Sequence, residues 1–396
     1  MIKILIKILI ILFIFNLPVY PLNYKILLGI DVLEKENFSI LKNKKVGLVT
    51  NHTGRNTKKE STIDILYKNV NLVALFSPEH GIRGTEDREG IESSIDTKTG
   101  LPIYSLYGDH KRPKKEWLEN IDVLVFDIQD IGSRFYTYIT TMGYCMEECA
   151  KYKKEFVVLD RPNPINGLIV EGEVLESKYK HFSGYYCIPI RHGMTVGEIA
   201  AFHKNDLNLD LKLTIIRMEQ WKRNMWFDQT GIEWINTSPN MRNLRAATLY
   251  PGIGCFESTN ISVGRGTNIP FEIIGAPWIN SDLLLKEIRK LNLPGIKFEK
   301  TKFTPKASLY KDQECHGLKL IITDREKLRS TEVFIYLISI LRNLFPDNFE
   351  YKISKMTGSD LIKEMLEKNK SPESIIKIIR EKCKKFYDLR KIFLLY

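Results

Sequence analysis

The chain has 396 residues, with 59 basic against 48 acidic side chains and a formal net charge of +11. Its length allows two or three domains, and its 43% hydrophobic and 27% charged residues are typical of globular proteins, which excludes a disordered or fibrous chain. Six cysteines are too few for a disulfide scaffold of this size. The positive charge is compatible with a polyanionic partner, such as nucleic acid or a cell-envelope polymer, or with a bias toward lysine in the composition.

The first residues have the pattern of an export signal. Lys3 and Lys7 accompany an unbroken apolar run at residues 8–15, and Pro18 follows shortly after. A short basic segment before a short apolar one is typical of a secretory signal and is short for a membrane span. We therefore expect residues 1–22 to be a signal peptide or an uncleaved N-terminal anchor. The mature protein is then exported, either periplasmic or extracellular.

From residue 44 to about residue 212, short β-rich runs alternate with helical ones. The predicted strands are residues 45–50, 71–76, 102–106, 121–128 and 155–160. Nearly continuous apolar strands between helices predict a mainly parallel sheet that is covered on both faces. We therefore expect residues 23–220 to form a Rossmann-like, doubly wound α/β domain. No G-x-G-x-x-G follows the first strand, which disfavours nucleotide binding.

The remainder of the chain has a different pattern. Residues 234–278 are rich in turn sequences such as S-P-N, Y-P-G and G-A-P-W. Beyond them, helical patterns at 283–291, 331–344 and 371–386 are mixed with short strands around 317–323. We expect residues 221–396 to form a second, smaller α+β domain that completes a cleft with the first.

Polar side chains follow four of the predicted strands. Ligands bind beyond the carboxyl ends of the strands in a doubly wound sheet, so these residues are site candidates by position alone. They are Asn51 and His52 after the first strand, Glu79 and His80 after the second, Asp127, Gln129, Asp130, Arg134 and Tyr136 at the end of the fourth, and Asp160, Arg161 and Asn163 at the end of the fifth.

Three chemistries suit polar side chains gathered at this edge of the sheet. Paired carboxylates suit glycoside hydrolysis, and Glu79 is the candidate general acid because partial burial after an apolar strand would raise its pKa. Nucleophilic catalysis by Ser or Cys lacks a signature, since no G-x-S-x-G is present. No H-E-x-x-H spacing occurs either, which weakens the third chemistry, a metal site built from Glu79, His80, Asp127, Asp130 and His192. For each carboxylate the alternative is a structural role in a loop cap or an ion pair.

Two later segments hold further candidates. In R-H-G-M-T-V-G-E, Thr195 and Glu198 predict the capping box of a helix, while Arg191 and His192 just before it can face the crevice. In E-S-T-N-I-S-V-G-R-G-T, Arg265 lies between two glycines. That segment lacks the lysine of a phosphate-binding P-loop, so an ordered substrate loop is favoured.

The aromatic residues Tyr136 and Tyr138 in F-Y-T-Y can stack on a sugar ring or pack in the core. Basic residues are spread along the chain rather than clustered beside aromatic ones, which argues against a nucleic-acid partner.

Nine ordered phrases together resemble one known family. They are L-V-T-N-H-T-G, F-S-P-E-H-G-I-R-G, V-F-D-I-Q-D-I-G-S-R-F-Y-T-Y, L-D-R-P-N-P-I-N-G, P-I-R-H-G-M-T-V-G-E-I-A, S-P-N-M, Y-P-G, E-S-T-N-I-S-V-G-R-G-T and P-F-E-I-I-G-A-P-W. From about residue 29 to residue 396, the chain resembles the exo-β-N-acetylmuramidase (NamZ) family of peptidoglycan-recycling glycosidases.

This resemblance implies an enzyme that releases N-acetylmuramic acid from the non-reducing end of peptidoglycan fragments, with its active cleft between a Rossmann-like domain and a smaller C-terminal domain. It also implies a catalytic Glu and Tyr, which correspond to Glu79 and to Tyr136 or Tyr138, and no metal or nucleotide cofactor. The main departure is His52, where family members often carry Gln. The alternatives are a non-catalytic envelope or muropeptide-binding protein on the same fold, and a metal-dependent hydrolase.

Under this reading the partners are saccharides that contain N-acetylmuramic acid, and any membrane contact is through the N-terminal segment. The lactyl carboxylate of the sugar would pair with Arg161, Arg134 or Arg191, because a guanidinium binds a planar carboxylate through two parallel hydrogen bonds. Its hydroxyl and acetamido groups would be positioned by Asn163, Asn240 and Arg265.

Overall fold

A seven-stranded sheet organises the first part of the chain. In the computed structural model, which describes residues 26–82 and 94–396, its strand order is β3-β4-β2-β1-β5-β6-β9. The parallel strands are β1 (Lys45–Thr50), β2 (Asn71–Ser77), β4 (Pro102–Ser105), β5 (Val123–Asp127), β6 (Glu155–Leu159) and β9 (Leu213–Ile216). The edge strand β3 (Ser94–Ile95) is antiparallel to β4. The mainly parallel, doubly wound α/β class and the five predicted strands are confirmed.

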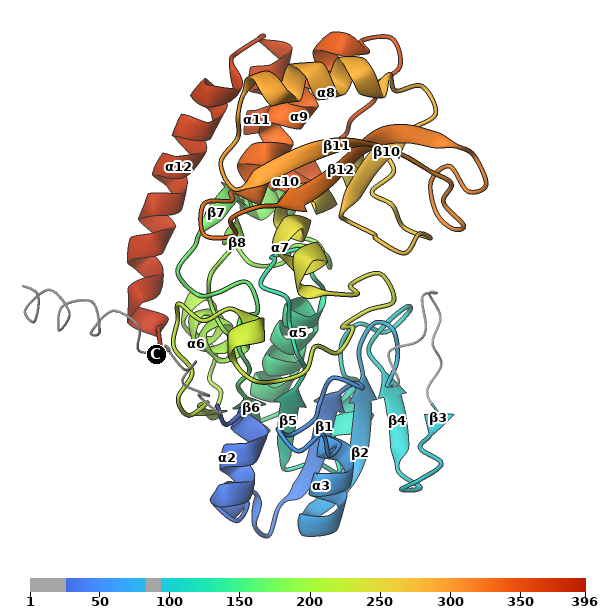
Figure 1. The fold of residues 1–396 in the computed structure, drawn as a ribbon. Helices are drawn as coiled ribbons and strands as arrows, with labels where there is room; N and C mark the ends of the chain where they lie inside the picture. Colours follow the sequence, from blue (N-terminus) through green and yellow to red (C-terminus); the bar gives the residue numbers. More distant parts are fainter. Residues whose placement is uncertain (1–25, 83–93) are drawn as a thin grey trace, which may run out of the picture.

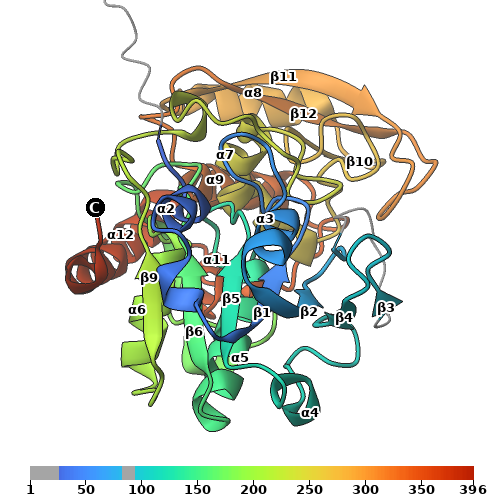
Figure 2. The same cartoon turned by 90° about the horizontal axis from the view of Figure 1, so that it is seen from below.

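Helices cover both faces of this sheet (Figure 2). On one face lie α2 (Gly29–Lys35) and α3 (Thr62–Asn69), and on the other α5 (Tyr138–Lys151) and α6 (Val196–Asp206), while the short α4 (Lys115–Leu118) precedes β5. In β5, Val123 and Val125 belong to the core under α2 and α3, whereas Leu124 and Phe126 belong to the core under α5. Side chains alternate between the two faces of a strand, so a sheet buried on both faces requires strands that are apolar throughout.

The strand order opens a crevice between β1 and β5. From β1 the chain proceeds outward to β2 and β4, whereas from β5 it proceeds in the opposite direction to β6 and β9. The loops that follow β1 and β5 therefore diverge, and this point of a doubly wound sheet is where ligands bind. Asn51 directly follows β1, and residues 128–130 directly follow β5.

A three-stranded antiparallel sheet organises the second part of the chain (Figure 1). Its order is β10-β12-β11, formed by β10 (Ile273–Ala276), β12 (Cys315–Ile322) and β11 (Ile296–Phe303). Around it lie the helices α7 (Leu244–Ile253), α8 (Ser281–Lys290), α9 (Ser330–Leu344), α10 (Ser354–Thr357), α11 (Leu361–Glu367) and α12 (Pro372–Leu389). The predicted smaller α+β unit is thereby confirmed, and the predicted boundary at residue 220 lies between β9 and α7.

Short elements connect the two parts. A two-stranded sheet of β7 (Glu171–Val174) and β8 (Pro189–Arg191) lies between them, and β7 contacts α12, α10 and α9. The 3-10 helices are η1 (Ser39–Leu41), η2 (Ser177–Tyr179), η3 (Phe227–Gln229), η4 (Gly254–Ser258) and η5 (Arg390–Phe393). All six cysteines are free and five of them are buried, as expected for small apolar residues.

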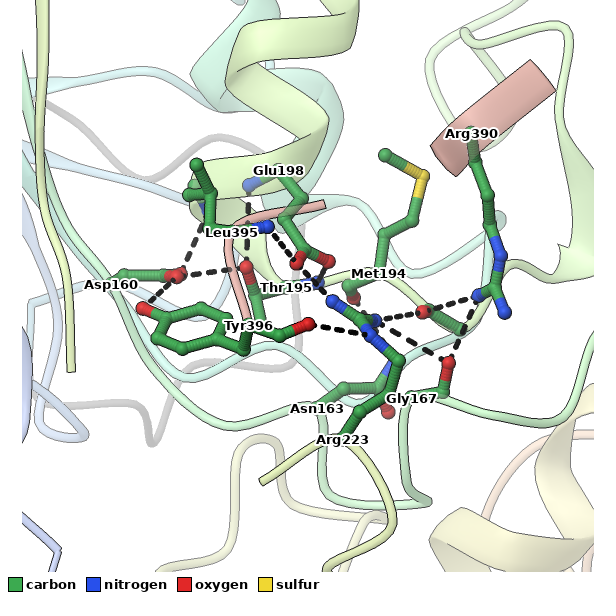
Figure 3. Close-up of polar contacts among 12 residues, drawn as sticks. Asp160, Asn163, Gly167, Met194, Thr195, Glu198, Arg223, Arg390, Leu395 and Tyr396 are labelled. Atoms are coloured by element: carbon green, nitrogen blue, oxygen red, sulfur yellow. Dashed lines mark hydrogen bonds and ion pairs between the residues drawn. The ribbon is translucent and has the colours of Figure 1, made fainter. Parts of the chain in front are cut away.

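The end of the chain returns to the first part of the molecule (Figure 1). The hydroxyl of Tyr396 donates a hydrogen bond to Asp160 Oδ2 at 2.7 Å and accepts one from the Met218 N–H at 2.8 Å. The Leu395 N–H donates to Glu198 Oε1 at 2.9 Å (Figure 3). Because Asp160 directly follows β6, this C-terminal anchor ties residues 395–396 to the carboxyl edge of the large sheet.

The predicted capping box of α6 is confirmed. Thr195 Oγ1 accepts a hydrogen bond from the Glu198 N–H at 3.2 Å, and Glu198 Oε2 accepts one from the Thr195 N–H at 3.0 Å. In the described ranges we find no helix with the length and apolar character that a bilayer crossing requires. The predicted N-terminal signal or anchor, residues 1–22, lies outside the described residues.

Candidate functional site

Glu79 follows β2 in a tight turn beside the start of α5. Its Oε2 accepts a hydrogen bond from the hydroxyl of Thr137, the N-cap residue of α5. The turn is closed by the Gly81 N–H, which donates to the Pro78 carbonyl at 3.1 Å, and His80 within it has a φ of 69°. A left-handed residue other than glycine is uncommon and is characteristic of functional sites. The half-buried Glu79 carboxylate is therefore held in a defined place at the edge of the crevice.

Tyr136 and Tyr138 lie on either side of Thr137, and both contact Thr237. The Tyr136 hydroxyl is 2.7 Å from Thr237 Oγ1, and the Tyr138 hydroxyl donates to the Thr237 carbonyl at 2.5 Å. Burial raises the pKa of both phenols, and the nearby carboxylates of Asp130 and Glu79 act in the same direction. Both side chains are therefore neutral at physiological pH and act through hydrogen bonds rather than as phenolates.

The loops after β1 and β5 are joined by a small network. Asn51 Oδ1 accepts hydrogen bonds from the N–H and the hydroxyl of Thr53, at 2.9 and 2.6 Å. Thr53 Oγ1 in turn accepts from the Gln129 N–H at 3.0 Å, and Gln129 Nε2 donates to the carbonyls of Asp130 and Pro162. This network fixes the Asn51 amide, whose buried Nδ2 has no partner among the described residues.

Asp130 has a buried carboxyl group, and only one of its two oxygens accepts a hydrogen bond from the described residues. Its Oδ2 accepts the Gly132 N–H at 2.7 Å, while its Oδ1 is buried without a partner in the described part of the chain. Gly132 has a φ of 82°, and a Cβ there would lie 2.4 Å from Asn163 Oδ1, so the turn requires glycine. Burial raises the pKa of Asp130 to about 7.

His52 bridges the crevice to the segment that precedes α7. Its Nε2 is 2.6 Å from the carbonyl oxygen of Asn236, which places the ring proton on that nitrogen. Burial lowers the pKa of His52, with the charges of Arg55 and His80 acting in the same direction. The ring is therefore neutral at pH 7, and its contact with Asn236 links the two parts of the molecule.

Two cavities meet at the loop after β1. One has a volume of 530 Å³ and includes Gln129, Arg161 and Trp234 in its lining. The other has a volume of 580 Å³ and extends along Asn51 and Ile82. His52, Arg55 and Lys59 line both cavities and form the wall between them.

Two family models together match most of the chain. The model described as exo-beta-N-acetylmuramidase NamZ, N-terminal, matches residues 46–245, and the corresponding C-terminal model matches residues 248–396. The chain belongs to the NamZ family.

Individual relatives agree with this assignment. The peptidoglycan beta-N-acetylmuramidase NamZ of Bacillus subtilis (strain 168) is 44% identical over 379 residues, which cover 94% of this chain and 92% of that protein. Two crystal structures of DUF1343 family proteins from Bacteroides fragilis NCTC 9343 have TM-scores of 0.88 and 0.76 to this chain, at 38% and 34% identity. Each covers 94% of this chain and 99% of the other. The resemblance drawn from the nine phrases is confirmed.

Within this NamZ fold, two of the arginines expected to bind a carboxylate already hold one. Arg161 pairs with Asp127 through its Nε at 2.5 Å and its Nη2 at 2.9 Å, and Thr62 donates to the same carboxylate at 2.5 Å. Arg191 pairs with Glu171 at 3.0 Å and donates to the Ile165 carbonyl. Buried ions require such partners. Asp127 therefore serves as the counter-ion of Arg161, and Arg161 is among the residues that line the 530 Å³ cavity.

The expectation for Arg134 is revised by its surroundings. Its Nη1 donates to the carbonyls of Glu173 and Ile188 at 2.6 and 2.8 Å, and its Nη2 donates to those of Met356 and Thr357 at 3.0 and 2.7 Å. The side chain is 1% exposed. Arg134 thus joins the β7–β8 sheet to α10 and is occupied by backbone carbonyls, so its contacts are structural.

Asn163 and His192 are both buried, and both form hydrogen bonds with the backbone of Met194. Asn163 Nδ2 donates to the Met194 carbonyl at 3.0 Å, and its Oδ1 accepts the Ile165 N–H at 3.2 Å. His192 Nδ1 accepts the Met194 N–H at 3.1 Å. Burial lowers the pKa of His192 to about 3, so the ring is neutral. These contacts stabilise the loop before α6 rather than face the cavities described above.

Asn240 and Arg265 come from the second part of the chain. Asn240 is buried in the segment that contains Thr237, which contacts both tyrosines. Arg265 forms an ion pair with Glu257 and lies 5.2 Å from the centre of the Phe271 ring. Of the two, Asn240 belongs to the segment that reaches the crevice.

Sequence reasoning missed three residues that the structure brings to the crevice. Thr137, inside the F-Y-T-Y phrase, holds Glu79, and Arg55 directly follows the T-N-H-T-G phrase and lines both cavities. Their place in or beside a phrase was a usable signal. Thr237 directly precedes the S-P-N-M phrase and so had the same signal, but its contact with Tyr136 joins residues about 100 positions apart and could not be read from the sequence.

A metal site was one of the three chemistries that the sequence allowed. Considering residues 26–82 and 94–396, no group of three or more His, Cys, Asp or Glu side chains is placed to share a metal ion.

Proposed function

We propose that this protein is an exo-acting β-N-acetylmuramidase that releases N-acetylmuramic acid from the non-reducing end of peptidoglycan fragments. The observation that carries the proposal is the position of Glu79 in a chain matched along its length by NamZ models. Glu79 is held by Thr137 beside Tyr136, at the crevice where a doubly wound sheet binds ligands.

Glu79 supplies the general acid of this reaction. Thr137 donates to its Oε2, which leaves Oε1 to carry a proton to the oxygen of the leaving sugar. Tyr136 is neutral, so its role is to hydrogen-bond the sugar near the reacting carbon rather than to attack that carbon. The Tyr138 hydroxyl already donates its proton to the Thr237 carbonyl, so Tyr136 is the stronger candidate for this contact with the sugar.

Arg55 is the strongest candidate to bind the lactyl carboxylate of the sugar. Its Nε and Nη1 donate to the carbonyls of His52 and Lys59, at 3.1 and 3.0 Å, which fixes the guanidinium plane. Within residues 26–82 and 94–396 no partner is found for its Nη2, and the side chain lies on the wall that both cavities share. A guanidinium held in this way suits a planar carboxylate.

Export of the protein is part of the proposal, because the basic and apolar pattern of residues 1–22 is typical of a secretory signal. An exported enzyme meets peptidoglycan fragments outside the cytoplasm. Fractionation of cells that express the full chain would locate it, and recovery in the cytoplasmic fraction would contradict this part of the proposal.

The test compares wild type with Glu79→Gln on two substrates, the p-nitrophenyl β-glycoside of N-acetylmuramic acid and a disaccharide with N-acetylmuramic acid at its non-reducing end. Loss of a general acid lowers kcat by about 10²–10⁴-fold. The loss is expected to be larger for the disaccharide, since nitrophenolate leaves without a proton. Glu299→Gln, at an exposed position of β11, is the matched control and is expected to retain wild-type turnover.

Undiminished turnover by Glu79→Gln would contradict its assignment. Binding of the disaccharide by wild type without any product would favour the alternative of a non-catalytic binding protein. Loss of wild-type activity on addition of a chelator would favour the metal-dependent hydrolase.

A further inference from the structure

Among the buried polar atoms that lack a hydrogen-bond partner in the described part of the chain, two belong to carboxyl or amide side chains in the loops that follow β1 and β5. They are Asp130 Oδ1 and Asn51 Nδ2, on side chains that are 5% and 2% exposed. Leaving such a group unpaired is energetically costly, so each unpaired atom in a native protein requires an explanation. The orientation of the Asn51 amide is fixed, because the Thr53 N–H can donate only to its oxygen.

The two atoms lie at the ends of neighbouring strands. β1 and β5 pair in register with Thr50 opposite Asp127, and the Thr53 hydroxyl bridges the loops that follow them. The negative charges of Asp130 and Glu79 both contribute to the raised pKa of the Tyr136 and Tyr138 hydroxyls. The two carboxyl groups therefore lie near the same pair of phenols.

A ligand that satisfies both unpaired atoms must offer one N–H and one oxygen. An acetamido group carries these two groups, and N-acetylmuramic acid has one on the carbon next to the reacting carbon. A lactyl carboxylate does not fit, because it would approach the Asp130 carboxylate with like charge. The unpaired acceptor and donor thus select the amide among the substituents of this sugar.

We propose that Asp130 Oδ1 accepts the N–H of the 2-acetamido group of N-acetylmuramic acid, that Asn51 Nδ2 donates to its carbonyl oxygen, and that this oxygen is the internal nucleophile of the reaction. The proposal rests on the proposed glycosidase function and deepens it. Participation of the substrate's own acetamido group is an established alternative to a protein nucleophile in glycoside hydrolysis.

In the first step the acetamido oxygen forms a bond to C1 while the bond from C1 to the leaving oxygen breaks. The leaving oxygen keeps the electron pair of that bond and takes the proton of Glu79. The oxazolinium ring that results carries its positive charge next to the Asp130 carboxylate. In the second step water attacks C1 and gives its proton to Glu79, and the bond from C1 to the acetamido oxygen breaks. One water is consumed, the acetamide is restored and the configuration at C1 is retained.

The structural alternative for Asp130 is the turn that its Oδ2 makes with Gly132. Asp130→Asn separates the two roles, because an amide oxygen can still accept the Gly132 N–H while the negative charge is removed. Asp160→Asn is the matched control. It also removes a buried carboxyl, but Asp160 has donors on both of its oxygens and lies at the C-terminal anchor.

The experiment measures kcat and KM on three p-nitrophenyl glycosides: the acetamido sugar, its N-trifluoroacetyl analogue and its 2-hydroxyl analogue. Hydrolysis of the acetamido sugar by wild type establishes the proposed function first, and a failure at that stage concerns the function alone. Wild type is expected to be slower on each analogue by about 100-fold, the usual effect of losing one preorganised interaction in the transition state. Asp130→Asn is expected to lose a similar factor in kcat on the acetamido sugar, with KM changed less, and to lose most of its preference for that sugar.

Asp160→Asn is expected to retain the wild-type preference, even if it unfolds at a lower temperature. Equal rates of wild type on the three glycosides would overturn the proposal, as would an Asp130→Asn variant with the wild-type preference. A thiazoline analogue of the proposed intermediate provides a second readout that needs no variant. It is expected to inhibit wild type competitively, and absence of inhibition would also overturn the proposal.

Discussion

Two adjacent strands of the large sheet end near buried aspartates whose surroundings differ. Asp130 follows β5 and Asp160 follows β6. Burial raises the pKa of each to about 7, and at Asp160 the nearby Glu198 adds to the shift while hydrogen bonds oppose it. The oxygens of Asp160 accept four hydrogen bonds, from the N–H groups of Arg161 and Gly197 and from the hydroxyls of Thr195 and Tyr396. Figure 3 shows the contacts with Thr195 and Tyr396.

The Oδ1 of Asp130 has no such donor among the described residues. A fully partnered buried carboxyl stabilises the fold, whereas a partly partnered one is costly unless a ligand completes it. Substitutions at the C-terminal anchor should therefore reduce stability and spare activity. Substitutions at Asp130 should do the reverse.

The largest expected effect is that of Tyr396→Ala on stability. The substitution removes a ring that packs 5.1 Å from Trp221 and a hydroxyl bonded to Asp160. Truncation of a fully buried aromatic side chain costs about 3–5 kcal/mol, and because Tyr396 is half-buried we expect a loss near the lower end, about 3 kcal/mol. Urea unfolding at pH 7 measures this loss, and kcat below the unfolding transition should equal that of wild type. Tyr67→Ala, at a tyrosine that is 49% exposed, is the control and should change stability by about 0.5 kcal/mol or less. Equal unfolding midpoints for the two variants would show that the C-terminal anchor does not stabilise the fold.

Asp160→Asn is expected to cost less than the loss of Tyr396. The amide has one oxygen for four donors, and its NH₂ group faces hydroxyls that donate to the carboxylate in wild type. Leaving buried donors without an acceptor costs about 1–3 kcal/mol. The same urea measurement applies. A variant as stable as wild type at pH 7 would show that the four hydrogen bonds do not offset the burial of the carboxylate.

Asp130→Asn is expected to have a stability effect of opposite sign that depends on pH. Burial raises the pKa of Asp130 to about 7 in the folded protein. Between about pH 4 and pH 7 the folded state therefore holds a proton that the unfolded state has released, and the free energy of unfolding falls as pH rises. The variant lacks this dependence. It should be more stable than wild type at pH 8, and this advantage should disappear toward pH 4. A difference that does not vary with pH would contradict the assignment of this proton to Asp130.

The smallest expected effect is that of His52→Gln. The ring is neutral, and a glutamine amide can donate to the Asn236 carbonyl in place of Nε2, so the link across the crevice is preserved. We expect a change in stability of less than about 1 kcal/mol, the net worth of one ordinary hydrogen bond. Turnover should change only slightly. A tenfold loss of kcat/KM would show that His52 contacts the substrate through its unpaired Nδ1.

Local patterns determined much of the fold. Strands buried on both faces must be apolar throughout, so β1, β2, β4, β5 and β6 were recognisable as continuous apolar runs. The capping box of Thr195 and Glu198 was recognisable because its partners are three residues apart. The polar residues at the strand ends were also identifiable, since each directly follows a run that can be read from the sequence.

The tertiary structure decided which of these polar residues remain available to a ligand. The arginines at positions 134, 161 and 191 all looked suitable for a carboxylate, yet each is occupied by groups brought from other parts of the chain. For Arg134 these include the carbonyls of Met356 and Thr357, more than 200 positions away. A buried guanidinium requires polar partners, and nothing near it in the sequence specifies which groups these are.

The same reason separates the two aspartates. In the sequence both are acidic residues after an apolar strand, and both are candidates for the same rim. Only the folded chain brings Tyr396 to Asp160 and leaves Asp130 with an oxygen that has no partner among the residues the structure describes. The sequence by itself determined the strands, the helix cap, the family and the edge of the sheet where the site lies. Hydrogen bonds between residues distant in the chain decided which side chains at that edge hold the structure and which are left for the substrate.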